Sequence, residues 1–467
     1  MDEHGDRYDD VLGRVFAGRK AIVTGAPVAG LTGWVDALRR LGSQRCLLIG
    51  GGLGTGPVPD ESDAEWVLVD VAAPDPVAEF RRWEAVLGDP PPAVREALDR
   101  YDPDRRALLV IVPFQAVEQV AGRPAFGPRR PAWVTLEDKT TCDDLFDAAG
   151  VVRPQCAVVA PEADPLRAAA RRIDRGDGTV WAGDARDGFN GGAVFVRRIS
   201  AGGPSADELD EATRFYAAHC AQVRVAPFLE GIPCSIHGMA AADGVAVFRP
   251  VEMITLRPAR GDGFRYAGAA TFWDPPDPDR EAMREAARRI GTLLRDGYEY
   301  RGAFGIDGVL GTDGFLPTEL NPRFGAGLGQ VARGVPDLPI QLLHLALVAD
   351  PGMAIGVGEL EELVVGAADR CRAGGAWTMV ERAWTETTLR PVVSTGEQCT
   401  FTDDETAATA TLLTGPASAG GFVRLTSDLE RTPVGPSAAP RAVAAFALAD
   451  RELGAGIGPL HPARPVR

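Results

Sequence analysis

The sequence predicts an α/β protein in which a domain with a parallel sheet precedes a larger region of antiparallel strands. Two patterns support this prediction. Short apolar runs alternate with helical stretches from residue 20 to about residue 115, which indicates a parallel sheet with helices on its faces. Between residues 221 and 270, short runs rich in apolar and β-branched residues follow one another across turns, which is typical of antiparallel strands.

Residues 1–130 are the predicted parallel-sheet domain. Strands are expected in "KAIVTGA", "RCLLIGG", "EWVLVDV" and "ALLVIVPF", and a helix in "GWVDALRRLG", which Gly42 ends. The turn "IGGGLGTGP" follows the second strand, and Pro57 and Pro59 interrupt the segment after it. A dinucleotide site needs such glycines between the first strand and a helix. A structural or substrate-side domain is therefore favoured over a dinucleotide-binding one.

A linker is predicted next, because residues 116–135 are rich in Pro, Gly and Arg. The second domain is expected at residues 131–220, with a helix at "DDLFDAAGV", then strand, helix, strand and the hairpin "DARDGFNGGAVFVRRI". The backbone N–H groups of Asn190, Gly191 and Gly192 could approach an anion closely. Other hairpin turns have the same composition, so a plain turn is the alternative.

The third domain is expected at residues 221–350, and the rest of the chain is a C-terminal extension. In the helix "DREAMREAARRIGTLLRDGY", apolar residues recur at helical spacing, which predicts packing against a core. Residues 336–350 predict another packing helix. Residues 351–467 are strand-like and Ala-rich, and they carry no motif that predicts a function.

The segment "GAFGIDGVLGTDGFLPTELNPR" holds the most informative pattern. Two apolar runs flank a Gly/Asp turn, which predicts a β-hairpin. Glu319, Asn321 and Arg323 alternate along the second arm, so their side chains share one face. The hairpin would bring Asp307 of the first arm to the same point. Two carboxylates and an amide oxygen suit Mg²⁺, and a neighbouring guanidinium suits phosphate.

Pro317 lies within the second arm of this hairpin. Proline has no N–H to donate to a strand ladder. Pro317 is therefore expected at a β-bulge, or with its nitrogen facing away from a partner strand.

The composition excludes several classes of partner. The 467 residues are 45% hydrophobic and 24% charged, as in an ordinary soluble protein, and the net charge of −16 argues against nucleic acid and anionic membranes. The seven cysteines are scattered, which suggests free thiols in a cytoplasmic protein. The acidic N-terminus predicts no signal peptide, and no apolar run is long enough to span a bilayer.

Lysine is scarce in this chain. Of the 49 basic residues, only Lys20 and Lys139 are lysines. Lys20 has a simple place at the start of the first strand. Lys139, in "VTLEDKTTCDDLF", is a candidate for a compact positive charge on phosphate, because arginine is wider and differently shaped.

Lys139, the glycine hairpin, "APFLEGIPCSIHG" and the "GIDG…TELNPR" hairpin occur in this order. In this arrangement residues 130–350 resemble the ATP-grasp superfamily of carboxylate ligases, nearest to the pheganomycin-type peptide ligases. The N-terminal stretch is similar in layout to the Rossmann-like domain that precedes the grasp in such enzymes. The resemblance implies a two-lobed ATP-grasp fold, with the small lobe at 131–220 and the large lobe at 221–350.

The resemblance also implies a role for each motif residue. Glu319 would bridge two Mg²⁺ ions, with Asp307 and Asn321 completing the ligands. Arg323 would hold the transferred phosphate, and Lys139 would contact the nucleotide phosphates. The remaining implied ATP-binding residues are Asn190, Gly191 and Gly192 in the glycine hairpin and Phe228, Leu229 and Glu230 at the adenine-binding hinge.

The sequence departs from the family pattern at two points. The second small-lobe lysine of the family corresponds to Ala182 or Gly183, and the candidates to replace it are Arg186 and Arg197. The carboxylate that grips the ribose in the family corresponds to Pro233. These departures raise the question of how the chain would hold the nucleotide.

The predicted activity is an ATP-dependent carboxylate–amine ligase that forms an amide or peptide bond through an acyl phosphate, in specialised metabolism. The expected partners are a small carboxylic acid or amino acid and an amine or peptide acceptor; a homodimer is left open. Candidates for the acid's carboxylate are Arg249, Arg257, Arg260 and Arg265, which lie in strands and a loop near the presumed cleft.

Two alternatives belong to other classes. A non-catalytic nucleotide-binding module would explain the missing lysine, and a dinucleotide-dependent oxidoreductase would use the N-terminal glycines. A nucleophilic mechanism is disfavoured, because Cys234, Ser235 and His237 are neighbours in sequence without evidence of triad geometry.

Overall fold

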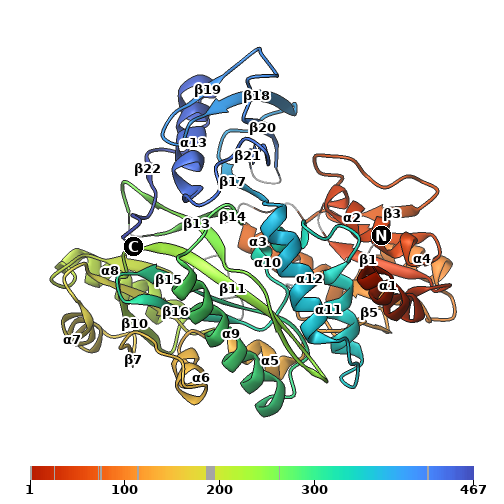
Figure 1. The fold of residues 1–467 in the computed structure, drawn as a ribbon, viewed down its shortest axis with the longest axis horizontal. Helices are drawn as coiled ribbons and strands as arrows, with labels where there is room; N and C mark the ends of the chain where they lie inside the picture. The colour runs from red at the N-terminus through yellow and green to blue at the C-terminus, as the bar shows by residue number, and fades with distance from the viewer. Residues whose placement is uncertain are drawn as a thin grey trace.

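The computed structural model describes residues 3–25, 27–71, 73, 76–112, 115–185, 195–261, 263–417 and 420–466. Figure 1 shows the N-terminal domain at one end, a central part in green and yellow, and the C-terminal part above it in blue. Three main sheets organise these parts, and one of them continues from the central part into the C-terminal part.

The N-terminal domain has a four-stranded parallel sheet in the order β3-β2-β1-β4. All four strands predicted from the sequence are present. The elements of this domain are α1 (Glu3–Phe16), β1 (Ala21–Gly25), η1 (Val28–Leu31), α2 (Thr32–Arg40), β2 (Cys46–Gly50), β3 (Ala64–Leu68), α3 (Pro76–Gly88), α4 (Pro92–Tyr101) and β4 (Leu108–Ile111).

The predicted linker is anchored to this domain. Arg123, whose side chain is 1% exposed, forms an ion pair with Asp102 at 3.0 Å (Nε to Oδ2). Composition did not reveal this ion pair, because Pro, Gly and Arg occur in anchored turns and in mobile linkers alike. The elements that follow are β5 (Gln119–Val120), β6 (Arg123–Pro124), α5 (Pro131–Val134), η2 (Thr135–Glu137) and α6 (Cys142–Ala148).

A second sheet has four antiparallel strands in the order β7-β10-β8-β9. α7 and α8 pack with it around a core that includes Trp181 and Tyr216. The elements are β7 (Ala157–Val159), α7 (Ala163–Ile173), β8 (Thr179–Gly183), β9 (Val196–Ile199), α8 (Ala206–His219) and β10 (Val223–Pro227). A capping box at Ser205 and Glu208 begins α8.

The large sheet forms the centre of the molecule. Its central part contains β11 (Ile232–Ala241), β12 (Gly244–Val247), β13 (Val251–Pro258), β14 (Arg265–Ala270), β15 (Gly302–Gly311) and β16 (Gly314–Asn321). The helices of this part are α9 (Asp277–Gly297), α10 (Ala326–Ala332), α11 (Ile340–Ala349) and α12 (Val357–Arg370). α10, α11 and α12 share one hydrophobic core with the N-terminal domain.

The C-terminal part extends the same sheet, because β17 pairs with β14. Its elements are β17 (Gly374–Val380), β18 (Thr388–Ser394), β19 (Cys399–Phe401), β20 (Ala410–Pro416), β21 (Gly421–Ser427), α13 (Ala439–Leu453) and β22 (Leu460–His461). The carboxylate of Glu252, on β13, accepts hydrogen bonds from the backbone N–H groups of Ala438 and Ala439 at the start of α13. The extension is therefore joined to the central sheet by strand pairing and by a buried helix cap.

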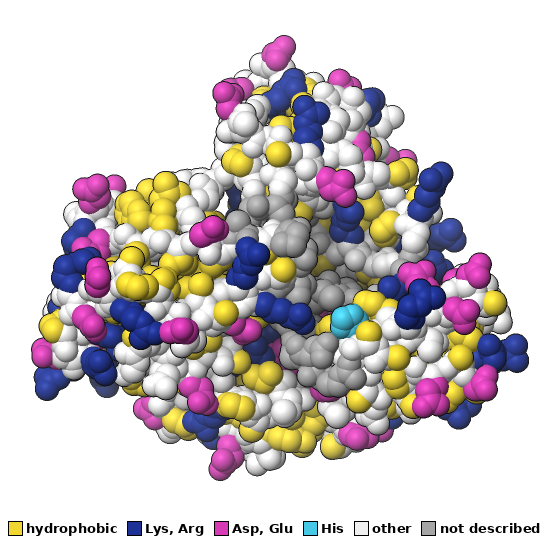
Figure 2. Space-filling view, turned by 180° about the vertical axis from the view of Figure 1, so that it is seen from behind, with side chains coloured by type: hydrophobic (Ala, Val, Ile, Leu, Met, Phe, Trp, Pro, Cys, Tyr) yellow, Lys and Arg dark blue, Asp and Glu magenta, His cyan; other side chains and the backbone are white. Residues whose placement is uncertain are grey.

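The surface and the thiols agree with the expectations from composition. On the face in Figure 2, basic and acidic side chains of the described residues are interspersed. All seven cysteines lie in the described part of the chain, and each is free. Among the described helices, none has the length and hydropathy needed to cross a membrane.

Candidate active site

The candidate site is a cavity of about 470 Å³ between the small antiparallel sheet and the large sheet. β8 and β10 line one side, and β11, β13, β15 and β16 line the other. Its charged and polar lining residues are Lys139, Arg224, Glu230, Ser235, His237, Thr255, Arg257, Tyr266, Asp307, Thr318, Glu319, Asn321 and Arg323. Most residues singled out in the sequence therefore face one space.

Two carboxylates of the site are brought together by a β-bulge. Asp307 on β15 and Glu319 on β16 are direct cross-strand partners, whereas the next pair along the hairpin is Gly308 with Pro317. Thr318 is thus the extra residue of a bulge, and its Oγ1 hydroxyl donates to the Asp307 carbonyl oxygen at 3.2 Å. The expectation that Pro317 lies at a bulge is confirmed. If the same chain paired in continuous register, Thr318 would lie opposite Asp307 and Glu319 would point to the opposite face of the sheet.

The carboxylate pair is electrostatically strained. Burial raises the pKa of Asp307 to about 6, and the negative charge of Glu319 acts in the same direction. Asn321 relieves part of this cost, because its Nδ2 donates to Asp307 Oδ2 at 2.9 Å. Lys139 Nζ forms an ion pair with Glu319 Oε1 at 2.9 Å. A positive charge beside these carboxylates is therefore favourable.

A divalent cation fits this donor set in its chemistry. The side-chain oxygens of Asp307, Glu319 and Asn321 are hard ligands, and added positive charge would offset the cost of burying two neighbouring carboxylates. In the part of the chain that the structure describes, no group of three or more His, Cys, Asp or Glu could hold a metal. Two carboxylates and an amide are typical of Mg²⁺ sites that also use phosphate oxygens and water as ligands.

Arg323 is oriented from two sides. Its Nη2 donates to Asn321 Oδ1 at 2.8 Å, and its Nε pairs with Glu137 Oε1 at 3.1 Å. Glu137 lies on η2 and also forms an ion pair with Arg129. The Arg323 side chain is 13% exposed and lines the cavity. This arrangement presents a fixed guanidinium next to the carboxylate pair, which suits an anionic group.

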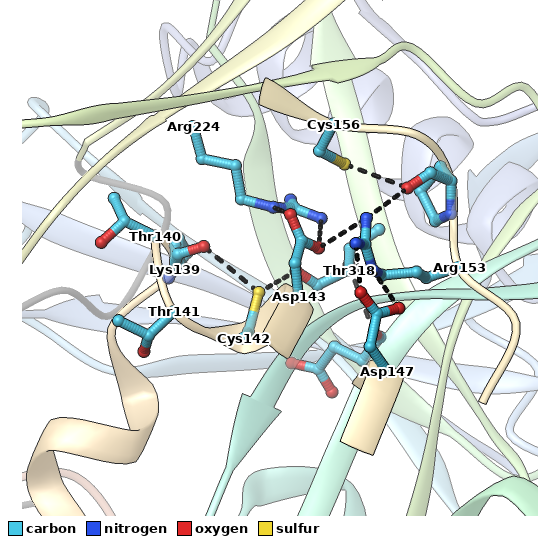
Figure 3. Close-up of polar contacts among 12 residues, drawn as sticks. Lys139, Thr140, Thr141, Cys142, Asp143, Asp147, Arg153, Cys156, Arg224 and Thr318 are labelled. Carbon is cyan, nitrogen blue, oxygen red and sulfur yellow. Dashed lines mark hydrogen bonds and ion pairs between the residues drawn. The ribbon is translucent and has the colours of Figure 1, made fainter. Parts of the chain in front are cut away.

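Lys139 reaches the carboxylates from a turn just before α6. The Asp138 side chain stabilises this turn by accepting hydrogen bonds from the N–H of Thr140 at 2.8 Å and the N–H of Ala185 at 3.1 Å. The Lys139 carbonyl accepts from the Cys142 thiol at 3.2 Å, as Figure 3 shows. Lys139 is 6% exposed, so its ammonium group is buried inside the cavity rather than solvated.

The hinge predicted at residues 227–230 lines the opposite end of the cavity. Phe228 and Leu229 contribute apolar surface, and the guanidinium of Arg198 lies 4.1 Å from the centre of the Phe228 ring. The Phe228 N–H already donates to the Gly178 carbonyl at 2.9 Å. Glu230 forms an ion pair with Arg257 at 3.0 Å. The apolar walls are where the sequence predicts them, but the Glu230 carboxylate has partners within the protein.

Of the four arginines that the sequence suggests for the acid substrate, Arg257 alone is among the lining residues of the cavity. Arg257 lines the cavity, whereas Arg249 is 1% exposed and is held by Asp274 and Asp369. Arg265 donates to Thr378 Oγ1 at 3.2 Å, on the C-terminal side of the sheet. Strand alternation explains this, since Tyr266, the next residue, faces the cavity.

The structure therefore removes Arg249 and Arg265 from the substrate candidates. The sequence pattern is the same for an arginine that is solvated, faces the cavity or belongs to a buried ion network, so it could not distinguish these cases. Arg260 is exposed and does not line the cavity. Asn190, Gly191 and Gly192, with the proposed replacement Arg186, lie outside the described residues. Arg197 pairs with Glu211 at 3.2 Å.

Arg224 is a site residue that sequence reasoning missed. It lies on β10 directly opposite Ala182 of β8, and both residues line the cavity. Asp143 holds its guanidinium with two hydrogen bonds, at 2.9 Å to Nε and 2.7 Å to Nη2, as Figure 3 shows. The structure thus has a buried cation across from Ala182, one of the two positions that the resemblance assigns to the family's second lysine. The available signal was an arginine inside the apolar run "VRVAP".

Ser235 and His237 also face the cavity. Ser235 Oγ lies 3.1 Å from His237 Nε2. Burial, with the positive charge of Arg323 second, lowers the pKa of His237 to about 4, so the ring is neutral near pH 7. A Cβ added at Gly327 would lie 2.3 Å from His237 Nε2, so glycine is needed for this close approach. Cys234 alternates to the other face of the strand and is buried in the core.

The carbonyl groups of the N-terminal glycine turn accept hydrogen bonds from the backbone N–H groups at the start of η1. The N–H groups of Val28 and Ala29, at the start of η1, donate to the carbonyls of Gly52 and Leu53, both at 2.9 Å. A dinucleotide pyrophosphate would need such N–H groups free at the start of the first helix. This arrangement disfavours the dinucleotide alternative.

No protein-family model matches the sequence, and no curated protein matches it. Solved structures do match. N5-carboxyaminoimidazole synthase from Aspergillus clavatus, in complex with ADP and 5-aminoimidazole ribonucleotide, has a TM-score of 0.50 and 12% identity, covering 94% of this chain and 99% of that chain. Carboxyaminoimidazole ribonucleotide synthase from the same organism, complexed with ATP, has a TM-score of 0.50 and 12% identity, covering 94% and 98%. L-amino acid ligase from Bacillus licheniformis has a TM-score of 0.49 and 14% identity, covering 88% and 94%.

The likeness to the two synthase structures extends over nearly the whole of both chains. It confirms the predicted fold class, an N-terminal parallel-sheet domain followed by an ATP-grasp fold and a C-terminal extension. At 12% identity the likeness concerns the fold and not individual side chains.

Proposed function

We propose that this protein is an ATP-dependent carboxylate–amine ligase that forms an amide or peptide bond, releasing ADP and phosphate. One observation carries the proposal. The cavity places two opposed carboxylates, Asp307 and Glu319, next to the cations Lys139 and Arg323. Carboxylates that can hold Mg²⁺ together with fixed cations for phosphate are what phosphoryl transfer requires.

The roles follow from position. Asp307, Glu319 and Asn321 would hold Mg²⁺, since all three line the cavity. The ion would neutralise charge on the nucleotide phosphates. Lys139 would leave Glu319 for a phosphate oxygen, which is a short movement for a flexible side chain. Arg323 would steady the transferred phosphoryl group and the acyl phosphate formed from it.

We assign to Arg224 the part of the missing lysine. Its guanidinium faces the cavity from β10, across from Ala182 on the adjacent strand, which is one of the two expected positions of the family's lysine. The bidentate contact with Asp143 fixes its direction and leaves the remaining N–H groups for an anion. We therefore assign to Arg224 a contact with the nucleotide phosphates.

The base of the nucleotide would lie at the other end of the cavity, between Phe228 and Leu229 and the walls of the two sheets. The carboxylic acid or amino acid would bind beyond the carboxylate pair, near His237 and Tyr266. Activation of the acid as an acyl phosphate gives a good leaving group, so an amine can attack without a protein nucleophile.

A non-catalytic nucleotide-binding module is the second candidate. The absence of a lysine at Ala182 favours it, but Arg224 weakens that argument because it places a cation across from the same position. The bulge that brings Asp307 and Glu319 together has no evident use in a module that only binds nucleotide.

The direct test is ADP and phosphate release from Mg-ATP, run across a panel of amino acids and small acids with hydroxylamine as the trapping amine. We expect ADP formation that depends on the acid, with a hydroxamate product. AMP and pyrophosphate would contradict the proposed chemistry. ATP binding without turnover for any acid in the panel would favour the non-catalytic module.

A further inference from the structure

The C-terminal tail, residues 459–466, crosses from α13 to the hinge end of the cavity. Figure 1 shows β22 running from the C-terminal part back to the central sheet, next to β13. β22 pairs with β13 in antiparallel register, with Arg257 opposite His461 and Pro258 opposite Leu460. The tail is therefore held by strand pairing at the place where β13 contributes Arg257 to the cavity.

Two further contacts fix the tail beyond β22. Arg257 Nη2 donates to the Pro462 carbonyl at 3.2 Å, and the Arg464 N–H donates to Glu230 Oε1 at 2.9 Å. The same two side chains pair with each other, Arg257 Nη1 to Glu230 Oε2 at 3.0 Å. Their side chains are only 17% and 23% exposed. The ion pair and the tail thus hold each other in place.

Ala463 lies between these anchors and lines the cavity itself. On its other side it borders a second cavity of about 760 Å³. At Ala463 the tail therefore borders both spaces. The tail faces the same end of the site as Phe228 and Leu229, whose apolar side chains suit the base of a nucleotide.

We infer that the C-terminal tail is a wall of the nucleotide site, with Ala463 packing against the base or ribose and Glu230 serving as the anchor of the tail. This inference rests on the proposed function. It gives the C-terminal extension a part in binding ATP, although its sequence carries no motif. It also revises the role of Glu230, because both carboxylate oxygens are engaged by Arg257 and Arg464 rather than directed to an adenine.

The small side chain of Ala463 makes the inference testable. Enlarging it would fill the end of the cavity where the base binds, without touching the carboxylate pair. Ala463→Val and Ala463→Trp form a graded series in the full-length protein. Val466→Trp is the matched control, because Val466 is on the same tail, is 38% exposed and does not line the cavity.

Calorimetric titration with Mg-ADP and steady-state kinetics with Mg-ATP provide the readouts. We expect Ala463→Trp to raise the Kd for Mg-ADP and the KM for ATP by about tenfold or more, with a smaller rise for Ala463→Val. The kcat at saturating ATP should change much less than KM, because the reacting groups lie at the other end. Val466→Trp should behave like the unmodified protein.

The outcomes separate this inference from the proposed function. Nucleotide binding and turnover in the unmodified protein, with no change in Kd for either Ala463 variant, would overturn the tail wall and leave the ligase proposal standing. If Ala463→Trp fails to fold, Ala463→Val decides by the same criterion. An unmodified protein that binds no nucleotide would overturn both.

Discussion

Asp307 and Glu319 face each other across β15 and β16 because Thr318 adds one residue to the second strand. The bulge changes the alternation of side chains, so Glu319 joins the cavity face instead of the core face occupied by Leu320. The Thr318 hydroxyl and the Asp307 carbonyl are hydrogen-bonded, which stabilises the bulge from within the hairpin. The proposed chemistry thus depends on a local backbone irregularity.

Removing the charge of Glu319 should abolish catalysis while the fold persists. Glu319→Gln keeps the shape of the side chain but loses a negative charge that would hold Mg²⁺. We expect ADP formation to fall by about a hundredfold or more. Asp313→Asn is the matched control, because Asp313 lies in the turn of the same hairpin and pairs with Arg175 outside the cavity. Full activity in Glu319→Gln would contradict the metal-binding role.

Inserting one alanine between Thr318 and Glu319 tests the register itself. With a one-residue bulge kept, Glu319 would lie opposite Ile306, and its side chain would turn to the other face of the sheet, away from Asp307. We expect loss of ADP formation comparable to that of Glu319→Gln. Thr318→Ala is the control, because it keeps the number of residues and removes only the hydroxyl. Activity should stay within a few fold there, and an insertion variant with normal turnover would refute the importance of the register.

The sequence was most informative where chemistry and local geometry coincide. The alternation of Glu319, Asn321 and Arg323 placed three side chains on one face, and the missing N–H of Pro317 predicted the bulge. Scarcity of lysine drew attention to Lys139, which indeed contacts Glu319. Each of these inferences needed only neighbouring residues or residue types.

The parts that sequence could not supply depend on long-range pairing. Arg224 reaches its position because β10 pairs with β8, about forty residues earlier, and because Asp143 of α6 holds its guanidinium. Arg249 looked available for substrate until Asp274 and Asp369 were seen to enclose it. Only the folded chain shows which buried charges have partners.

Arg224 should contribute to nucleotide affinity. Arg224→Met removes the cation from the cavity but keeps a long side chain. We expect the KM for ATP to rise about tenfold or more, since a hydrogen bond to a charged group contributes roughly 1.5–3 kcal/mol. Ala182→Lys, added to this variant, should restore part of the affinity because it places a lysine opposite the lost guanidinium. Steady-state kinetics at varied ATP measures both effects.

A structural role of Arg224 would give a different result. Arg153 also lies near Asp143, at 3.7 Å, and pairs with Asp147, but it does not line the cavity. Arg153→Met should therefore alter stability without changing the KM for ATP. If both arginine variants raised KM equally, or if Ala182→Lys gave no recovery, the phosphate contact of Arg224 would be excluded.

Glu252 should make the stability of the protein depend on pH. Burial raises its pKa to about 7, although Ser437 and the N–H groups at the start of α13 oppose this rise. An unfolded glutamate has a pKa of about 4.3. Between these values the folded protein binds more protons at Glu252 than the unfolded chain, so stability falls as pH rises through this window. The loss from this residue should be roughly 1–3 kcal/mol.

Urea titrations at pH 5 and pH 8 on the unmodified protein and Glu252→Gln measure this effect. Raising the pH from 5 to 8 should lower the free energy of unfolding of the unmodified protein more than that of Glu252→Gln, because the variant has no charge to bury. Glu361→Gln should leave the pH dependence between pH 5 and pH 8 unchanged, because the lowered pKa of Glu361 lies below this range. Burial opposes ionisation of Glu361, but hydrogen bonds from Arg288 and the Val247 N–H outweigh it and lower its pKa. The stabilising charge of Glu361 is present at higher pH and is lost as the pH falls through its lowered pKa. An equal pH dependence of stability for the two variants would contradict the raised pKa of Glu252.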